Sequence, residues 1–295
     1  MTAASSGTTG LLRHLVRPRE LPAMGALVAG VLGAAVLIVA VPSASSTDVA
    51  APALVSQGAG PLAGAPGTRH QLDPLSPPKP GTYRLRTTAR STSAAGGGTT
   101  STKRGSTLQV LDLTRDASGN LHQSVESTGG QGSQRDEVVW RENGEYLVES
   151  SLGFMTPFGN NRAGCRWTPP VERLPQPLAA GTSWSSQGTC RVSSGPAKFT
   201  LHQAVKGEVT GTRRMTVGGV GVDVYVIQMS TAIRQAGRFG GRSVVVAVTV
   251  QETSLLAPDY GLTVRSDTES ASSVSNGGSA HSSSETVLES LTPGA

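Results

Sequence analysis

Several segments of the chain alternate apolar and polar residues with a period of two, which is typical of half-buried β-strands. This alternation runs through residues 83–90 and through residues 199–209, and valines recur at every second position in residues 244–250. Residues 220–229 are apolar on both faces, so this segment predicts a central strand. β-Branched residues dominate these segments, as a pleated, half-buried surface requires.

A different pattern near the start of the chain predicts a membrane segment. The run from Leu21 to Val41 contains no charged residue, and as a helix it would span about 30 Å, the thickness of the hydrocarbon core of a bilayer. Arg13, Arg17 and Arg19 precede it, and the positive-inside rule keeps such a flank in the cytoplasm. We therefore predict a cytoplasmic leader at residues 1–20, a single-pass transmembrane helix at 21–41, and a remainder outside the cell membrane.

The same run also resembles a cleavable signal peptide, because the small residues at 43–45 would suit a signal peptidase. Signal peptides usually carry an apolar region of roughly 7–15 residues. The longer run after a polar leader favours a retained signal-anchor. If the leader is cleaved, the protein is secreted.

Composition divides the remaining chain. Residues 42–79 are rich in Pro, Ala and Gly with few large apolar residues, and such a stretch predicts a disordered stalk. Residues 80–295 form the predicted extracytoplasmic β domain. Low-complexity pieces rich in Ser and Gly predict flexible loops near 91–106 and 266–284.

No 3.6-residue pattern stands out beyond the membrane segment, so the exported part is expected to be all-β. The spacing of turns predicts an antiparallel meander of roughly ten to twelve strands. An open barrel, a curved sheet and a sandwich all fit this pattern. The strongest turn signal is the Asn-Gly dipeptide at 143–144, which predicts a two-residue hairpin with Trp140 opposite Leu147.

The only two cysteines are Cys165 and Cys190. An even count in an exported chain predicts a disulfide bond, since the extracytoplasmic space permits oxidation. This bond would hold the Pro-rich segment 168–177, interpreted as a crossover, against the strand near Trp184. Two separate buried thiols are the alternative.

The sequence offers little catalytic chemistry. Its five histidines are scattered, and no HExxH, GxSxG, P-loop or strand-linked GxGxxG motif occurs. We therefore expect no enzyme activity, no cofactor and no metal site. A hydrolase with a dispersed site is the alternative, and it needs His122 or His202 beside an acid and a hydroxyl group.

Charge and apolar residues bear on partners. The formal net charge is +5, of which the leader supplies +2 through three arginines and one glutamate. The remainder is too small to indicate nucleic-acid binding. Phe154, Met155 and Phe158 lie in a segment rich in Gly and Pro that we interpret as a loop. If exposed, this hydrophobic loop would contact a lipid or a protein partner.

Short motifs connect the second half of the predicted domain to a wider group of proteins. They are Cys165-x-Trp167, Leu174-Pro-x-Pro-Leu178, Gly181-Thr-x-Trp184, Cys190 and Leu256-Ala-Pro-x-x-Gly261-Leu262. Through them the chain resembles uncharacterised exported or membrane-anchored β-rich proteins of high-GC Gram-positive bacteria over roughly residues 80–267. The resemblance implies an exported location, a disulfide bond and a β fold, and it implies no activity.

Three functional hypotheses follow. The first is a membrane-anchored domain with a binding or assembly role in the cell envelope, where an envelope protein, polymer or lipid is the partner. The second is a carrier that holds a lipid or other amphiphile in an apolar cavity of the β domain, and it predicts a pocket of roughly 300–1,000 Å³. The third is the hydrolase.

Overall fold

The computed structural model describes residues 75–94, 100–128, 134–143, 146–155, 162–175, 177–194, 197–239, 242–275 and 277–294. These residues form twelve strands and no helix, which confirms the all-β prediction. The predicted membrane segment 21–41 lies outside them. Within these ranges, no helix has the length and apolar character that crossing a bilayer requires.

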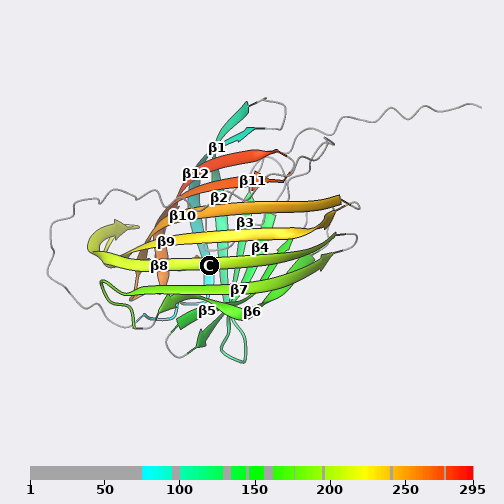
Figure 1. Cartoon of the computed structure of the whole chain (residues 1–295). Helices are drawn as coiled ribbons and strands as arrows, with labels where there is room; N and C mark the ends of the chain where they lie inside the picture. Colours follow the sequence, from blue (N-terminus) through cyan, green and yellow to red (C-terminus); the bar gives the residue numbers. More distant parts are fainter. Residues whose placement is uncertain are drawn as a thin grey trace, which may run out of the picture.

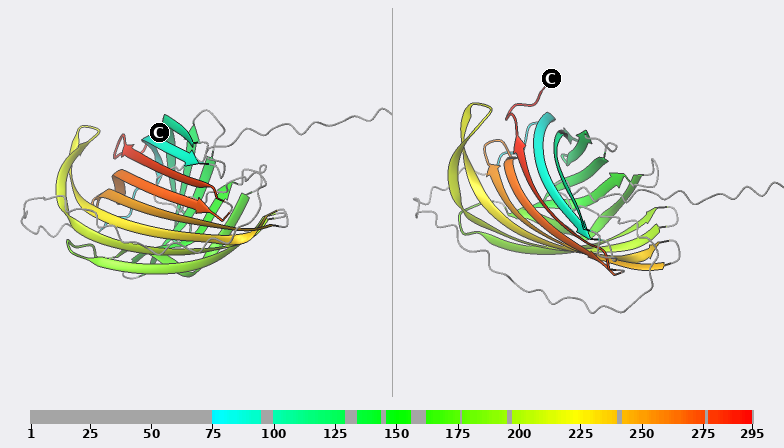
Figure 2. Two further views of the ribbon diagram at one scale, coloured as in Figure 1. Left: turned by 45° about the horizontal axis from the view of Figure 1, so that its top comes forward. Right: turned by 90° about the horizontal axis from the view of Figure 1, so that it is seen from above.

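The strands are β1 (Gly81–Ala94), β2 (Thr100–Arg115), β3 (Leu121–Thr128), β4 (Gln134–Asn143), β5 (Tyr146–Met155), β6 (Arg162–Pro175), β7 (Ser183–Ser194), β8 (Ala197–Val217), β9 (Val220–Phe239), β10 (Arg242–Ala257), β11 (Leu262–Val274) and β12 (Ser279–Leu288). Each strand pairs antiparallel with its neighbours in the chain, and β1 also pairs with β12, so that the meander closes into a barrel. Figure 1 shows β8 to β11 crossing the front of the barrel, with β2 to β4 behind them at a steep angle. The long strands β8 and β9 bend strongly around the interior (Figure 2).

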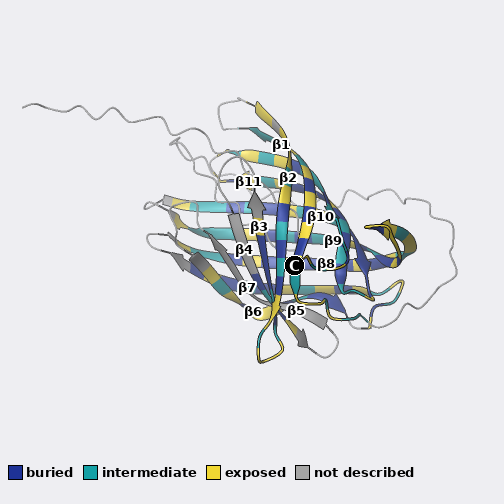
Figure 3. Cartoon of the chain, turned by 180° about the vertical axis from the view of Figure 1, so that it is seen from behind, coloured by how far each residue is buried: buried dark blue, intermediate teal, exposed yellow. Residues whose placement is uncertain are grey.

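The core lies inside the barrel because alternate residues of each strand point inward. Figure 3 shows this alternation as bands of buried and exposed residues along the ribbons. The sequence pattern predicted many of the inward positions correctly, and buried examples are Tyr83, Leu85, Leu201, Val205, Val246 and Val248. β9 buries residues on both faces, such as Val224 and Tyr225, as its pattern predicted. It is no more central than the others, because every strand of the closed barrel has two neighbours.

Two predicted flexible loops are largely strand. Residues 91–94 and 100–106 belong to β1 and β2, where Ser91 pairs with Lys103. Likewise, most of the segment 266–284 belongs to β11 and β12, whose Ser270 and Ser282 hydroxyl oxygens lie 2.9 Å apart. The prediction failed because it weighed composition alone. In the barrel, each of these strands has a neighbour on both sides that satisfies its backbone groups.

The predicted boundary of the stalk is also wrong by a few residues. Leu75, which we had assigned to the stalk, packs against a buried cluster that includes Leu174 and Trp184. The Ser76 amide donates a hydrogen bond to the Pro258 carbonyl oxygen over 2.8 Å. Residues 75–79 therefore belong to the folded domain, and we call them the strap.

The hairpin between β4 and β5 is confirmed, but its register differs from the prediction. Trp140 lies opposite Glu149 rather than Leu147, and Asn143 already pairs with Tyr146. The two connecting residues are thus 144–145, one position later than the Asn-Gly dipeptide. A bulge follows Val139 in this pairing, and β3 pairs with the other edge of β4, so the turn alone does not set the register.

The weakest seam of the barrel separates β6 from β7. A single residue pair, Thr168 with Thr189, joins them, whereas ten pairs join β1 to β12. The predicted crossover at 168–177 is in fact mostly part of β6, and it contains Pro169 and Pro170. Because proline has no backbone N–H, these residues cannot donate to a ladder.

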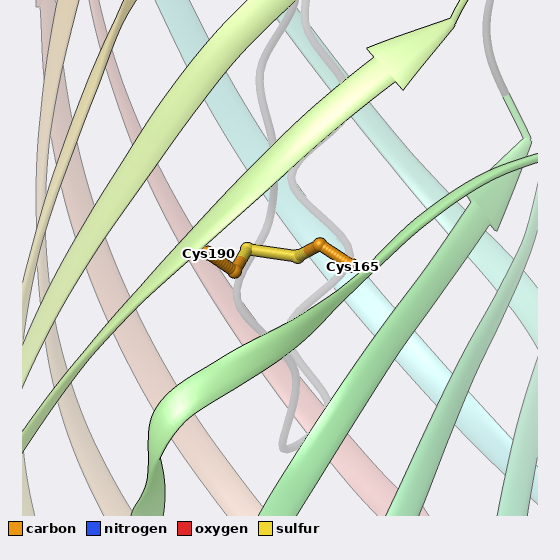
Figure 4. The surroundings of a disulfide bond; sticks show 2 residues. All are labelled: Cys165 and Cys190. Atoms are coloured by element: carbon orange, nitrogen blue, oxygen red, sulfur yellow. A yellow bond between two sulfur atoms is a disulfide. The ribbon is translucent and has the colours of Figure 1, made fainter.

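Other contacts close the seam. The side chain of Ser186 accepts a hydrogen bond from the Glu172 amide over 2.9 Å, which replaces one ladder bond. Trp167 is buried beside Gly188, where an added Cβ would lie 2.7 Å from the Pro169 carbonyl oxygen. The predicted disulfide between Cys165 and Cys190 is present, with a Cα–Cα distance of 5.6 Å, and Figure 4 shows it bridging the two strands.

We expect the disulfide to matter more here than in a fully laddered sheet. Replacing both cysteines, as Cys165→Ser with Cys190→Ser, should lower the free energy of unfolding by about 3 kcal/mol, the value for a closed loop of this length. Urea unfolding of the oxidised wild type and the double variant measures the difference. Reducing agent should destabilise the wild type and leave the variant unchanged; equal stability of all samples would contradict the prediction.

A glycine in β8 allows a second close approach inside the barrel. The Trp184 indole lies against the backbone at Gly207, which is its partner in the β7–β8 pairing, and a Cβ at this position would overlap the indole ring. No such contact exists at Gly211 of the same strand, where the space within 4 Å is open.

Gly207→Ala should therefore destabilise the domain by about 1–3 kcal/mol through overpacking, while Gly211→Ala should change stability by less than about 0.5 kcal/mol. The two variants add the same methyl group to the same strand, so thermal unfolding of both isolates the contact with Trp184. Equal effects of the two substitutions would show that the indole moves freely.

Candidate functional site

The two ends of the barrel differ. One end carries the strap, the turns 116–120 and 258–261 and the residues after β12, and we call it the strap end. An apolar cavity of about 160 Å³ lies inside this end. Its lining residues come from the strap and from eight strands, and they include Leu75, Pro77, Leu85, Leu111, Leu113, Leu121, Trp140, Leu174, Leu256, Leu262 and Leu288.

Polar side chains in the cavity wall are mostly occupied by one another. The Trp140 indole N–H donates to the side-chain amide oxygen (Oε1) of Gln123 over 3.1 Å. The hydroxyl oxygens of Thr286 and Thr87 lie 3.0 Å apart, and the Thr87 hydroxyl also donates to Gln109. Leucine, proline and tryptophan side chains supply the larger part of the wall, and the polar part includes Arg115, Arg173 and Thr263. The apolar part suits a hydrocarbon group.

One charged side chain forms part of the wall deep inside the barrel. Arg173 of β6 is 4% exposed and lines the cavity. Glu252 of β10 shares the inward face, because it pairs with the buried Met229. Burial raises the pKa of Glu252, while a hydrogen bond from the Ser254 hydroxyl and the positive charge of Arg173 oppose the rise. The Glu252 carboxyl group and Arg173 therefore lie close enough within the interior to interact.

The turn 116–120 and Arg115 border the cavity. We call the part of its lining formed by the exposed residues Arg115 and Gly119 the mouth. Arg115, at the end of β2, is exposed and lines the cavity together with Gly119. Its guanidinium donates a hydrogen bond to the Gly119 carbonyl oxygen over 2.8 Å. Within the described residues, Arg115 forms no ion pair.

The next residue, Asp116, forms its hydrogen bonds within and beside the turn. Asp116 accepts hydrogen bonds from the Asn120 side chain and from His122, and from the backbone amides of residues 118 and 120. These bonds, the Asn120 side chain first and His122 next, hold the pKa of Asp116 well below its ordinary value. The carboxylate therefore acts as the centre of an Asx-type turn.

The strap closes the cavity on one side. Pro77 and Pro78 line it, and so does Gly261 of the turn between β10 and β11, which lies against Ser76 and Pro78. Gly261 has a φ of +63°, and a Cβ at this position would lie 2.7 Å from the Pro78 nitrogen and would overlap the Ser76 carbonyl oxygen. Further along, the Tyr83 hydroxyl donates to the Lys79 carbonyl oxygen over 2.8 Å.

The hydrophobic segment singled out in the sequence lies elsewhere. Phe154 and Met155 are the last two residues of β5, so they belong to a strand and not to a loop, and Phe158 lies outside the described residues. β5 starts at the strap end and runs away from it, which places Phe154 and Met155 near the opposite end of the barrel.

The two strand histidines lie on separate strands. His122 of β3 contacts Asp116 over 3.1 Å, and His202 of β8 contacts the Thr189 hydroxyl over 3.0 Å. Four strands separate β3 from β8 along the shorter path around the barrel. His202 pairs with Thr189 of β7 on one side and with Arg234 of β9 on the other. Neither of these cross-strand partners carries a carboxylate. Among the described residues, no group of three or more His, Cys, Asp or Glu side chains is placed to hold a metal ion.

A wider hollow of about 2140 Å³ borders β1, β2 and β7 to β12. Most of the residues along it occupy positions that alternate with the buried ones, and they include Arg90, Lys206, Glu208, Asp267 and Glu269. Because charges of both signs are mixed there, the hollow shows no preference for one class of ligand. The cavity at the strap end is therefore the candidate site.

The comparisons add no family. Neither a scan against protein-family models nor a search of curated proteins found a match to this chain. Its candidate site therefore depends on geometry alone. Sequence patterns had predicted the strands that carry Leu85 and Leu256, but no signal indicated that the interior at this end stays partly empty.

We expect the fit between Gly261 and the strap to decide whether the cavity stays closed. Gly261→Ala should displace the strap and accelerate hydrogen exchange of the Ser76 amide by at least about tenfold, since its hydrogen bond to Pro258 is lost. Gly219→Ala is the matched control, because Gly219 has a φ of +84° with open space around it. The control should leave exchange in the strap unchanged; unchanged exchange in Gly261→Ala as well would show that the strap does not depend on this contact.

Proposed function

We propose that this protein is a binding protein of the cell envelope, without catalytic activity, whose β barrel takes a small apolar group of its ligand into the cavity at the strap end. The apolar cavity bounded by Leu111, Leu121 and Trp140 is the observation that carries the proposal. The disulfide is consistent with an extracytoplasmic location. An anchor at residues 21–41 would hold the domain at the membrane.

The size of the cavity limits what it can hold. Its volume of about 160 Å³ falls below the roughly 300–1,000 Å³ of pockets that enclose a whole ligand. An apolar cavity of about 150 Å³ admits benzene. The dimensions therefore favour one ring or one short chain, and they oppose the hypothesis of a carrier that encloses a complete lipid.

The free energy available from such a group is modest. Each buried methylene contributes about 0.8 kcal/mol, so a chain of about five carbons contributes about 4 kcal/mol, which corresponds to a millimolar dissociation constant. The cavity therefore works as a specificity pocket for one part of a larger ligand. The remaining affinity would come from contacts outside the cavity.

Filling the cavity should abolish this binding. Hexanol is a suitable probe, and the protein carries three tryptophans, of which only Trp140 is among the described lining residues. We expect hexanol to shift the ¹⁹F resonance of 5-fluorotryptophan at position 140, in the full-length protein in lipid nanodiscs, with saturation in the millimolar range. Leu111→Phe should remove this saturable shift, because its ring occupies the cavity.

Leu108→Phe provides the control, since Leu108 lies on the same strand and is 40% exposed, outside the cavity. This variant adds the same ring and should bind hexanol like the wild type. A Trp140 signal that never saturates, or that saturates equally in Leu111→Phe, would refute the proposed site.

A further inference from the structure

We infer that the ligand of the cavity is an anionic amphiphile, whose short apolar chain enters the barrel while its carboxylate or phosphate group pairs with Arg115 at the mouth. This inference rests on the proposed function and specifies its ligand class. It follows from the juxtaposition of one solvent-accessible guanidinium with a leucine-lined cavity.

Arg115 can pair with an anionic group because its side chain borders both the cavity and solvent. Its side chain lines the cavity and is also exposed to solvent, so one guanidinium borders both the apolar volume and water. A single hydrogen bond to the Gly119 carbonyl oxygen occupies one of its donors. A guanidinium has five N–H donors, which leaves enough for a bidentate contact with an anionic group.

The acidic groups near the mouth do not compete for Arg115. Asp116 uses both carboxylate oxygens within its own turn, on Asn120, His122 and backbone amides. Glu289, which follows β12 at this end, pairs with Arg86 over 2.8 Å. No carboxylate among the described residues therefore forms an ion pair with Arg115.

The interior guanidinium has a different role. Arg173 is buried and lies near Glu252. A ligand that placed its anionic group at Arg173 would have to bury that group away from water. Desolvation disfavours this orientation. The anionic group therefore stays at the mouth, and the chain points inward.

The test compares two probes of equal chain length, hexanoate and hexanol, on the full-length protein in lipid nanodiscs. The readout is the saturable ¹⁹F shift of 5-fluorotryptophan at Trp140, which reports the cavity and not the lipid. We expect the wild type to bind hexanoate about fivefold more tightly than hexanol, the range of a solvent-exposed ion pair. Added salt should reduce this preference by screening, and it should leave hexanol binding unchanged.

Arg115→Gln should abolish the preference, so that hexanoate binds no more tightly than hexanol to this variant. Arg84→Gln is the matched control: Arg84 is exposed near the same end of β1, is not among the lining residues, and its loss removes the same charge. It should keep the preference.

The outcomes separate the two proposals. If neither probe produces a saturable shift, the proposed function fails. If hexanol binds but hexanoate binds no better, the proposed function stands and the anionic ligand class is overturned. If hexanoate keeps its advantage in Arg115→Gln, the role of Arg115 is overturned. A loss of preference in both arginine variants would attribute it to general charge and would overturn the role of Arg115.

Discussion

The barrel depends on a seam that the backbone cannot close by itself. Every other pair of neighbouring strands shares a ladder of several residue pairs, but β6 and β7 share only Thr168 with Thr189. Pro169 and Pro170 lack the N–H groups that a ladder needs. A covalent bond from Cys165 to Cys190 joins these strands instead. Since all twelve strands form one ring, the shape of the interior depends on this crosslink.

The interior of this ring is filled to different extents near the seam and at the strap end. Large side chains such as Trp167 and Trp184 fill the space near the seam, where Gly188 and Gly207 allow them to lie against the backbone. At the strap end, leucines line the wall from several directions and leave a small apolar volume. The strap completes that wall with Pro77 and Pro78, and the exposed Arg115 lies in the same wall.

Sequence periodicity predicted the strands with a clear apolar face, because alternation at positions such as Leu201 and Val205 follows directly from the pleat. It failed for segments rich in Ser and Gly. Ser91 and Ser282 offer no apolar face, yet both lie in strands, since closure of the barrel supplies a hydrogen-bonding neighbour on each side. The register after Asn143 shifted for a related reason: neighbouring strands and a bulge constrained β4 in addition to the turn.

Local chemistry in the sequence determined the all-β class, the antiparallel meander and the disulfide partners, because alternation, turn residues and a single pair of cysteines each act over short stretches or leave one choice. Only the tertiary structure decided that β1 meets β12, that the strap belongs to the domain, and that an apolar cavity lies beside Arg115. These features join residues far apart in the chain. A cavity is the space that packed side chains fail to fill, so no local pattern encodes it.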